Sequence, residues 1–69
     1  MKHTPVISSN IASIGYDELS QTLEVTFDNG STYAYSGVPK SEYEALMAAS
    51  SHGKYLNSII KPRFVATKQ

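Results

Sequence analysis

The residues best suited to ligand chemistry lie late in the chain, in the segment Ser51-His52-Gly53-Lys54-Tyr55-Leu56-Asn57. A serine followed by a glycine at a helix start leaves backbone N–H groups free, and the helix dipole favours a phosphate or carboxylate there. Lys61 follows Lys54 at the spacing of one helical stripe, and Arg63 extends that stripe. The candidate binding residues are therefore Ser51, Gly53, Lys54, Tyr55, Asn57, Lys61 and Arg63.

A structural interpretation of the same segment is also open. Ser50 or Ser51 would cap the helix, Gly53 would relieve a tight turn, and the lysines would be solvated. Catalysis has little support, because the side chains of Ser51 and His52 are adjacent in sequence and should diverge rather than form a nucleophile–base hydrogen bond. We expect no enzyme activity, no metal and no cofactor.

The charge of the chain is divided between its two parts, although the net charge is zero. Residues 1–51 contain two lysines and six acidic residues, which is a net charge of −4. Residues 52–69 contain Lys54, Lys61, Arg63 and Lys68 and no acidic residue, which is +4. An anionic partner should therefore be attracted to the C-terminal quarter, unless these are simply solvated surface charges.

Five tyrosines make the chain rich in aromatic residues: Tyr16, Tyr33, Tyr35, Tyr43 and Tyr55. Tyrosines beside basic residues are typical of proteins that bind single-stranded nucleic acids. Core packing with the hydroxyl group at the surface explains the first four equally simply, and we prefer it for them. The role of Tyr55 stays open, since it borders the basic stripe.

Hydrophobic alternation predicts three strands that would position these residues. Leu23, Val25 and Phe27 alternate with polar residues, and the same period of two occurs around Ile14 and around Tyr33 and Tyr35. If Asn29-Gly30 formed a two-residue turn, Tyr33 and Tyr35 would lie on the polar face. A three-residue turn over residues 28–30 places both tyrosines on the apolar face, and we prefer this register for its consistent amphipathic pattern.

Two helices are expected after the strands. Ser41 and Glu44 match a capping box, and Tyr43, Leu46 and Met47 recur at helical spacing. The second helix should end near Pro62, because proline disfavours helix at the residue before it. We predict an α+β domain over residues 1–69, with an ordered core of about residues 6–64. Its fold would be a three-stranded antiparallel β-meander followed by two short helices packed on one sheet face.

The chain contains 69 residues and no cysteine, so its stability must come from packing or from self-association. A homodimer is therefore a possible state. The longest aliphatic run, residues 45–49, is far too short to cross a bilayer, and the first residues lead into no signal-peptide segment. We expect a cytoplasmic protein without a membrane partner.

The pattern from about Val6 to Phe64 resembles the KTSC domain, a small module named for its occurrence at the C-terminus of some lysyl-tRNA synthetases and also found as a free-standing bacterial protein. The matching motifs are Ser8-Ser9, Gly15-Tyr16-Asp17, Leu23/Val25/Phe27, Asn29-Gly30, Tyr33/Tyr35, Gly37-Val38-Pro39 and residues 51–57. The resemblance implies a bacterial or phage origin, and RNA binding is the function customarily suggested for the family.

Two function classes follow from these observations. The first is a non-catalytic module that binds RNA or another phosphate-bearing ligand weakly through the basic second helix. The second is a small homo-oligomeric interaction or sequestering protein that binds a protein partner or a nucleotide-like ligand. Zero net charge and a small core favour the second class, whereas the charge division favours the first.

Overall fold

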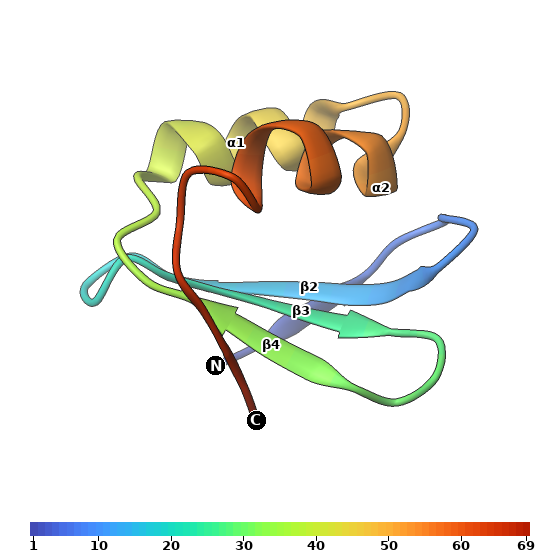
Figure 1. Ribbon diagram of the computed structural model, residues 1–69, viewed down its shortest axis with the longest axis horizontal. Coiled ribbons are helices and arrows are strands. Elements are labelled where there is room, and N and C mark those ends of the chain that lie inside the picture. Colours follow the sequence, from blue (N-terminus) through green and yellow to red (C-terminus); the bar gives the residue numbers. More distant parts are fainter.

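Five antiparallel strands form a single sheet in the computed structural model, which describes all residues from Met1 to Gln69 (Figure 1). The strands are β1 (His3–Pro5), β2 (Ile11–Asp17), β3 (Thr22–Phe27), β4 (Thr32–Tyr35) and β5 (Ala66–Lys68). Their order in the sheet is the same as their order in the chain, so the sheet is a meander that β5 completes after the helices.

The helices lie between β4 and β5 in the chain and cover one face of the sheet (Figure 1). They are α1 (Lys40–Ala48) and α2 (His52–Tyr55), and α2 continues directly into a π-helical turn, η1 (Leu56–Ile60). The predicted α+β class is therefore confirmed, as are the two helical segments on one sheet face. None of the helices is long and apolar enough to cross a membrane.

The predicted number of strands is wrong, because β1 and β5 add one strand to each side of the predicted three. Both strands are three residues long, and most of their residues are exposed. Such edge strands are held mainly by backbone hydrogen bonds, so their side chains need not alternate between apolar and polar. Both strands lie outside residues 6–64, the ordered core expected from the sequence, and belong to the sheet.

The turn between β3 and β4 has the predicted three-residue form. Val25 lies opposite Tyr33 and Leu23 lies opposite Tyr35. Gly30 has a φ angle of 90°, in the region that favours glycine. Tyr35 is consequently part of the core, with 2% of its surface exposed. Tyr33 points to the same face but is only half-buried.

The core lies between the sheet and the helical layer. Nine side chains are almost completely buried: Ile11, Ile14, Leu23, Val25, Tyr35, Val38, Leu46, Leu56 and Ile60. Strands β2, β3 and β4 supply the sheet side, where the two core side chains of β2 are three residues apart because a bulge interrupts its pairing with β3. Leu46 of α1 and Leu56 and Ile60 of η1 supply the helical side. Tyr16 stacks on Tyr43 at 4.7 Å between ring centroids, which joins β2 to α1.

Helix α1 begins without a side-chain cap, and α2 runs into a π-helical turn. The N-cap of α1 is Pro39 and no side chain caps it, so the predicted Ser41–Glu44 capping box is wrong. The helix begins at Lys40, which places Ser41 inside the first turn, where its hydroxyl is not at the cap position. In η1 the N–H of Lys61 donates to the carbonyl of Leu56 at 2.8 Å, a five-residue spacing.

Candidate functional site

Glu42 of α1 holds two of the predicted binding residues. Its Oε1 atom accepts a hydrogen bond of 2.7 Å from the Tyr55 hydroxyl, and its Oε2 atom lies 3.0 Å from Nη1 of Arg63. The hydrogen bond to Glu42 is the main cause that raises the pKa of Tyr55. The carboxylate thus offsets the charge of Arg63 and occupies the hydroxyl of Tyr55, so these two residues are engaged within the fold.

Ser51 and His52 connect the two helices. The Ser51 hydroxyl accepts from the backbone N–H of Lys54 at 3.3 Å, so Ser51 is the N-cap of α2. Nδ1 of His52 lies 2.8 Å from the carbonyl oxygen of Leu46, and because a carbonyl only accepts, Nδ1 is the donor. The capping interpretation of Ser51 is therefore confirmed. The two side chains have separate partners and form no nucleophile–base pair.

Gly53 packs closely against the loop between β1 and β2. A Cβ atom at this position would lie 2.9 Å from Oδ1 of Asn10. The absence of a side chain at Gly53 therefore lets the start of α2 approach this loop. This contact joins positions that are far apart in the sequence.

Five predicted site residues are exposed, and three of them, Lys54, Asn57 and Lys61, make no side-chain hydrogen bond within the protein. Neither lysine belongs to an ion pair. Lys54 lies in α2 and Lys61 follows the π-helical turn, whereas Arg63, the third residue of the predicted stripe, is paired with Glu42. Lys61 instead lines a cleft.

This cleft, which we call the aromatic cleft, lies on the helix-bearing face at the β4–β5 side of the sheet. It has a volume of about 210 Å³ and is lined by Phe27, Tyr33, Tyr35, Lys61 and Ala66. Phe27 and Tyr33 meet edge to face, with ring centroids 5.8 Å apart and an interplanar angle of 79°. Burial raises the pKa of Tyr35, and the neighbouring Tyr33 adds to the effect. Sequence analysis had named Lys61 for the helix stripe and had assigned the tyrosines to the core.

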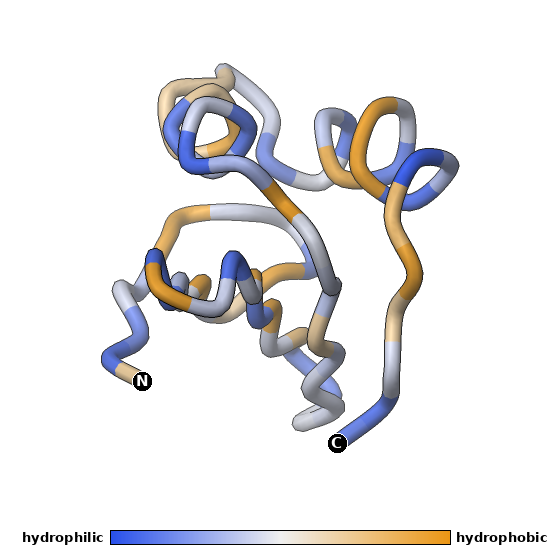
Figure 2. Tube along the Cα trace, turned by 90° about the vertical axis from the view of Figure 1, so that its left-hand side faces the viewer, coloured by the Kyte–Doolittle hydropathy of each residue, from blue (hydrophilic) through white to orange (hydrophobic).

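The C-terminal segment forms the outer wall of the aromatic cleft. Figure 2 shows this segment descending from the helical layer past the sheet and ending in hydrophilic residues. Ala66 lies opposite Tyr35 and Lys68 lies opposite Tyr33. Directly opposed residues share a sheet face, so Lys68 flanks the exposed side of Tyr33. No pattern in the sequence predicted β5, and this is why the cleft was missed.

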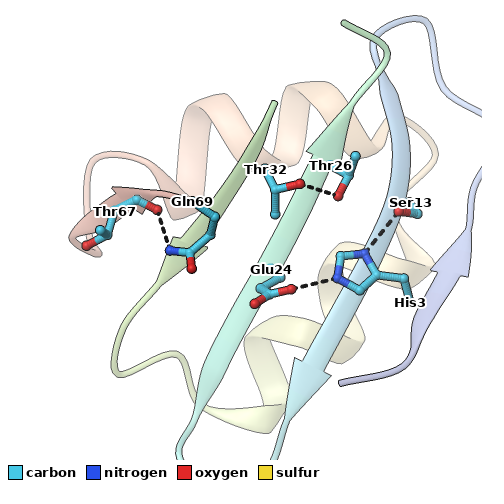
Figure 3. A network of polar contacts seen from close by, with 7 residues as sticks. All are labelled: His3, Ser13, Glu24, Thr26, Thr32, Thr67 and Gln69. Carbon is cyan, nitrogen blue, oxygen red and sulfur yellow. Dashed lines mark hydrogen bonds and ion pairs between the residues drawn. The ribbon is translucent and has the colours of Figure 1, made fainter. Parts of the chain in front are cut away.

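A second polar group lies on the open face of the sheet (Figure 3). Nδ1 of His3 is 3.0 Å from Oγ of Ser13, and Nε2 of His3 is 2.7 Å from Oε1 of Glu24. This order of hydroxyl, imidazole and carboxylate matches the composition of a catalytic triad. Neither cleft in the structure is lined by these residues, so no hollow for a substrate adjoins them. Their contacts tie β1 to β2 and β3.

The other cleft has a different character. Its volume is about 350 Å³, and it is lined by Ser9, Asn10, Phe27, Asp28 and Asn29. Its only charged lining residue is an aspartate, so it offers no cation to a phosphate. The aromatic cleft alone combines a cation with exposed ring surface.

The fold and the clefts define a small α+β domain with an open antiparallel sheet, one helical layer and a cationic aromatic cleft between them. The chain belongs to the KTSC domain family, whose family model matches residues 7–64. A crystal structure of a KTSC domain protein from Yersinia pestis has the same fold, with a TM-score of 0.92 and 40% sequence identity. The similarity covers 99% of this chain and 96% of that protein.

Relatives occur both as small proteins and as part of a larger enzyme. A protein of Tsukamurella paurometabola is 47% identical over 62 residues, which cover 90% of this chain and 92% of the relative. A lysine–tRNA ligase of Nostoc punctiforme is 43% identical over 56 residues, which cover 81% of this chain. That match spans 10% of the ligase, so the similarity concerns one small region of it.

Proposed function

We propose that this protein is a non-catalytic module that binds RNA through the basic residues of its C-terminal quarter. The observation that carries the proposal is the set of cations without ion pairs in residues 52–69. Lys54, Lys61 and Lys68 have no acidic partner, whereas Arg63 is paired with Glu42. Unpaired lysines on an otherwise acidic protein provide a local attraction for phosphates.

The similarity to part of a lysine–tRNA ligase supports RNA as the phosphate-bearing ligand. Within the candidate set, Lys54, Asn57 and Lys61 are the residues that the fold leaves exposed and free to contact RNA. Ser51, Gly53, Tyr55 and Arg63 already have contacts within the protein. We therefore assign phosphate contact first to the two lysines of this group.

Binding of this kind should be weak and moderately dependent on salt. Neutralising about three phosphates of a single strand gives a slope of about −2 in a plot of log K against log salt concentration. Fluorescence anisotropy of a labelled short RNA, measured at several salt concentrations, provides this slope. A folded protein that binds no RNA at low ionic strength would refute the proposal.

Charge-removal variants provide the matched test. The combination Lys54→Gln, Lys61→Gln and Lys68→Gln should abolish most of the affinity and flatten the salt dependence. The control is Lys2→Gln with Lys40→Gln, which also removes lysines but from outside the basic region; Lys40 pairs with Glu18 at 3.3 Å. Equal losses in the two sets of variants, compared per lysine removed, would contradict a localised binding surface.

A further inference from the structure

The aromatic cleft has the size of a site for one flat ring system. Its volume of about 210 Å³ is below the roughly 300–1,000 Å³ of sites that hold drug-sized ligands. Four of its five lining residues are hydrophobic, and three of these four are aromatic. A single nucleobase fits such a space better than a complete nucleotide does.

The hydroxyl of Tyr35 is available to a ligand in this cleft. Only 2% of the Tyr35 surface is exposed, and this residue lines the cleft. Its hydroxyl has no hydrogen-bond partner in the protein, whereas the hydroxyls of Tyr16 and Tyr55 bond to Val38 and Glu42. Because no buried side-chain polar atom in the protein lacks a hydrogen-bond partner, the Tyr35 hydroxyl belongs to the small exposed part of the residue and can bond to water or to a group that enters the cleft.

The rings of Phe27 and Tyr33 provide the stacking surface. They are arranged edge to face, so the two rings cannot stack on each other in parallel. Both side chains are only half-buried although they lie at the helix-bearing face. A base entering the cleft would cover exposed ring surface, which is how sequence-tolerant binders of single strands hold their ligands.

Two free cations flank these rings. Lys61 lines the cleft, Lys68 lies opposite Tyr33, and neither has an ion pair. A nucleotide within a strand has a phosphate on each side, so two cations near the aromatic cleft suit a base that enters it from such a strand. Single-stranded RNA meets this description, whereas the bases of duplex RNA are stacked and paired and cannot enter.

We propose that the aromatic cleft binds one unstacked base of single-stranded RNA, with the adjacent phosphates at Lys61 and Lys68 and the base edge at the Tyr35 hydroxyl. This inference rests on the proposed RNA binding and adds to it a preference for single strands. The sequence preference should be small, because ring stacking is available to every base.

The test compares two lysines of the same helical segment. Lys61→Gln and Lys54→Gln remove the same charge, at the cleft and away from it. We expect Lys61→Gln to weaken binding of a short single-stranded RNA more than Lys54→Gln does, and the two variants to bind a duplex RNA with equal affinity. Anisotropy measures both ligands, and thermal melting confirms that each variant is folded.

Tyrosine variants test the stacking and the hydroxyl separately. Tyr33→Leu removes the ring at a half-buried position and should weaken single-strand binding about tenfold, within the range found for lost base–aromatic stacks. Its affinity for inorganic polyphosphate, an anionic polymer without bases, should stay unchanged. Tyr35→Phe keeps the core ring and should weaken single-strand binding to a smaller extent.

The outcomes separate the two proposals. If RNA binds but Lys61→Gln and Tyr33→Leu behave like Lys54→Gln, the cleft assignment is refuted and the proposed function stands. If neither single-stranded nor duplex RNA binds the folded protein, both are refuted. Binding of AMP or UMP as tightly as of the oligonucleotide would also overturn the inference, because it would identify a free nucleotide as the ligand.

Discussion

Tyr55 and Glu42 form a hydrogen bond of 2.7 Å that joins the end of α2 to the first turn of α1. Because the other carboxylate oxygen of Glu42 contacts Arg63, this one acidic residue organises both helices and the segment that leads to β5. The ion pair between Glu42 and Arg63 also restrains a cation in the basic quarter of the chain. Glu42 should therefore stabilise the fold while it offsets part of the positive charge of the C-terminal quarter.

The first prediction concerns Glu42→Gln. Loss of the charge should lower the melting temperature, because the hydrogen bonds from Tyr55 and Arg63 lose their charged acceptor. It should also raise RNA affinity, because Arg63 is released. The control Glu44→Gln makes the same charge change on the same helix at a residue without an ion pair. Equal melting temperatures of the two variants would contradict the structural role assigned to Glu42.

The second prediction concerns the core position of Tyr35. Tyr35→Ala should reduce the free energy of unfolding by about 3–5 kcal/mol, as other truncations of buried aromatic residues do. Such a loss is large enough to unfold a domain of this size. Tyr35→Phe keeps the packing and should remain folded. Urea denaturation measures both variants, and a stable Tyr35→Ala protein would contradict the observed register.

The third prediction concerns the β3–β4 turn. Gly30 has a φ angle of 90°, and no atom lies within 4 Å of the place a Cβ would occupy. The cost of Gly30→Ala therefore comes from the backbone alone and should be about 1–2 kcal/mol. Gly30→Asn should cost less, since asparagine tolerates this region better. Chemical denaturation of the two variants checks this order, and an Ala variant as stable as the wild type would exclude a constrained turn.

The fourth prediction concerns stability at alkaline pH. The pKa values of Tyr16 and Tyr35 are raised mainly by burial, and that of Tyr55 mainly by its hydrogen bond to Glu42. The folded state therefore holds these protons more tightly than the unfolded state, whose tyrosines titrate near pH ~10. The stabilisation is complete below that pH and is lost as the pH rises through the folded-state values.

Urea denaturation on either side of pH ~10 measures this loss. Replacing the three tyrosines with phenylalanine should make the free energy of unfolding less dependent on pH in this range. Replacing Tyr33 and Tyr43 provides the control, because these substitutions also remove tyrosine hydroxyls. An identical alkaline slope in both sets of variants would show that the raised pKa values do not govern the effect.

Short-range patterns in the sequence determined the central part of the sheet and the family of this protein. The alternation of Leu23, Val25 and Phe27 and the position of Gly30 predicted the central strands, the three-residue turn and the direction of Tyr33 and Tyr35. These features depend on the period of a strand and on local turn geometry, and both are visible in the order of residues. The family membership is likewise carried by motifs along the chain.

Contacts between distant segments were decided only by the tertiary structure. Tyr55 and Glu42 are 13 residues apart, Arg63 and Glu42 are 21 apart, and His3 and Glu24 are also 21 apart. Polar contacts at such separations follow no period, so no pattern in the sequence predicts them. The edge strands β1 and β5 were missed for a related reason, since backbone hydrogen bonds hold them with little side-chain burial.

The aromatic cleft shows most clearly the difference between what the sequence determines and what only the tertiary structure decides. Sequence reasoning treated an inward tyrosine as core and an outward tyrosine as available for binding. Tyr33 faces inward and remains half-buried, because Lys61 and Ala66, rather than a further layer of packed side chains, form the walls beside it. The register of β4 follows from the sequence, but whether an inward ring is sealed depends on where the helical segment ends and β5 returns to the sheet.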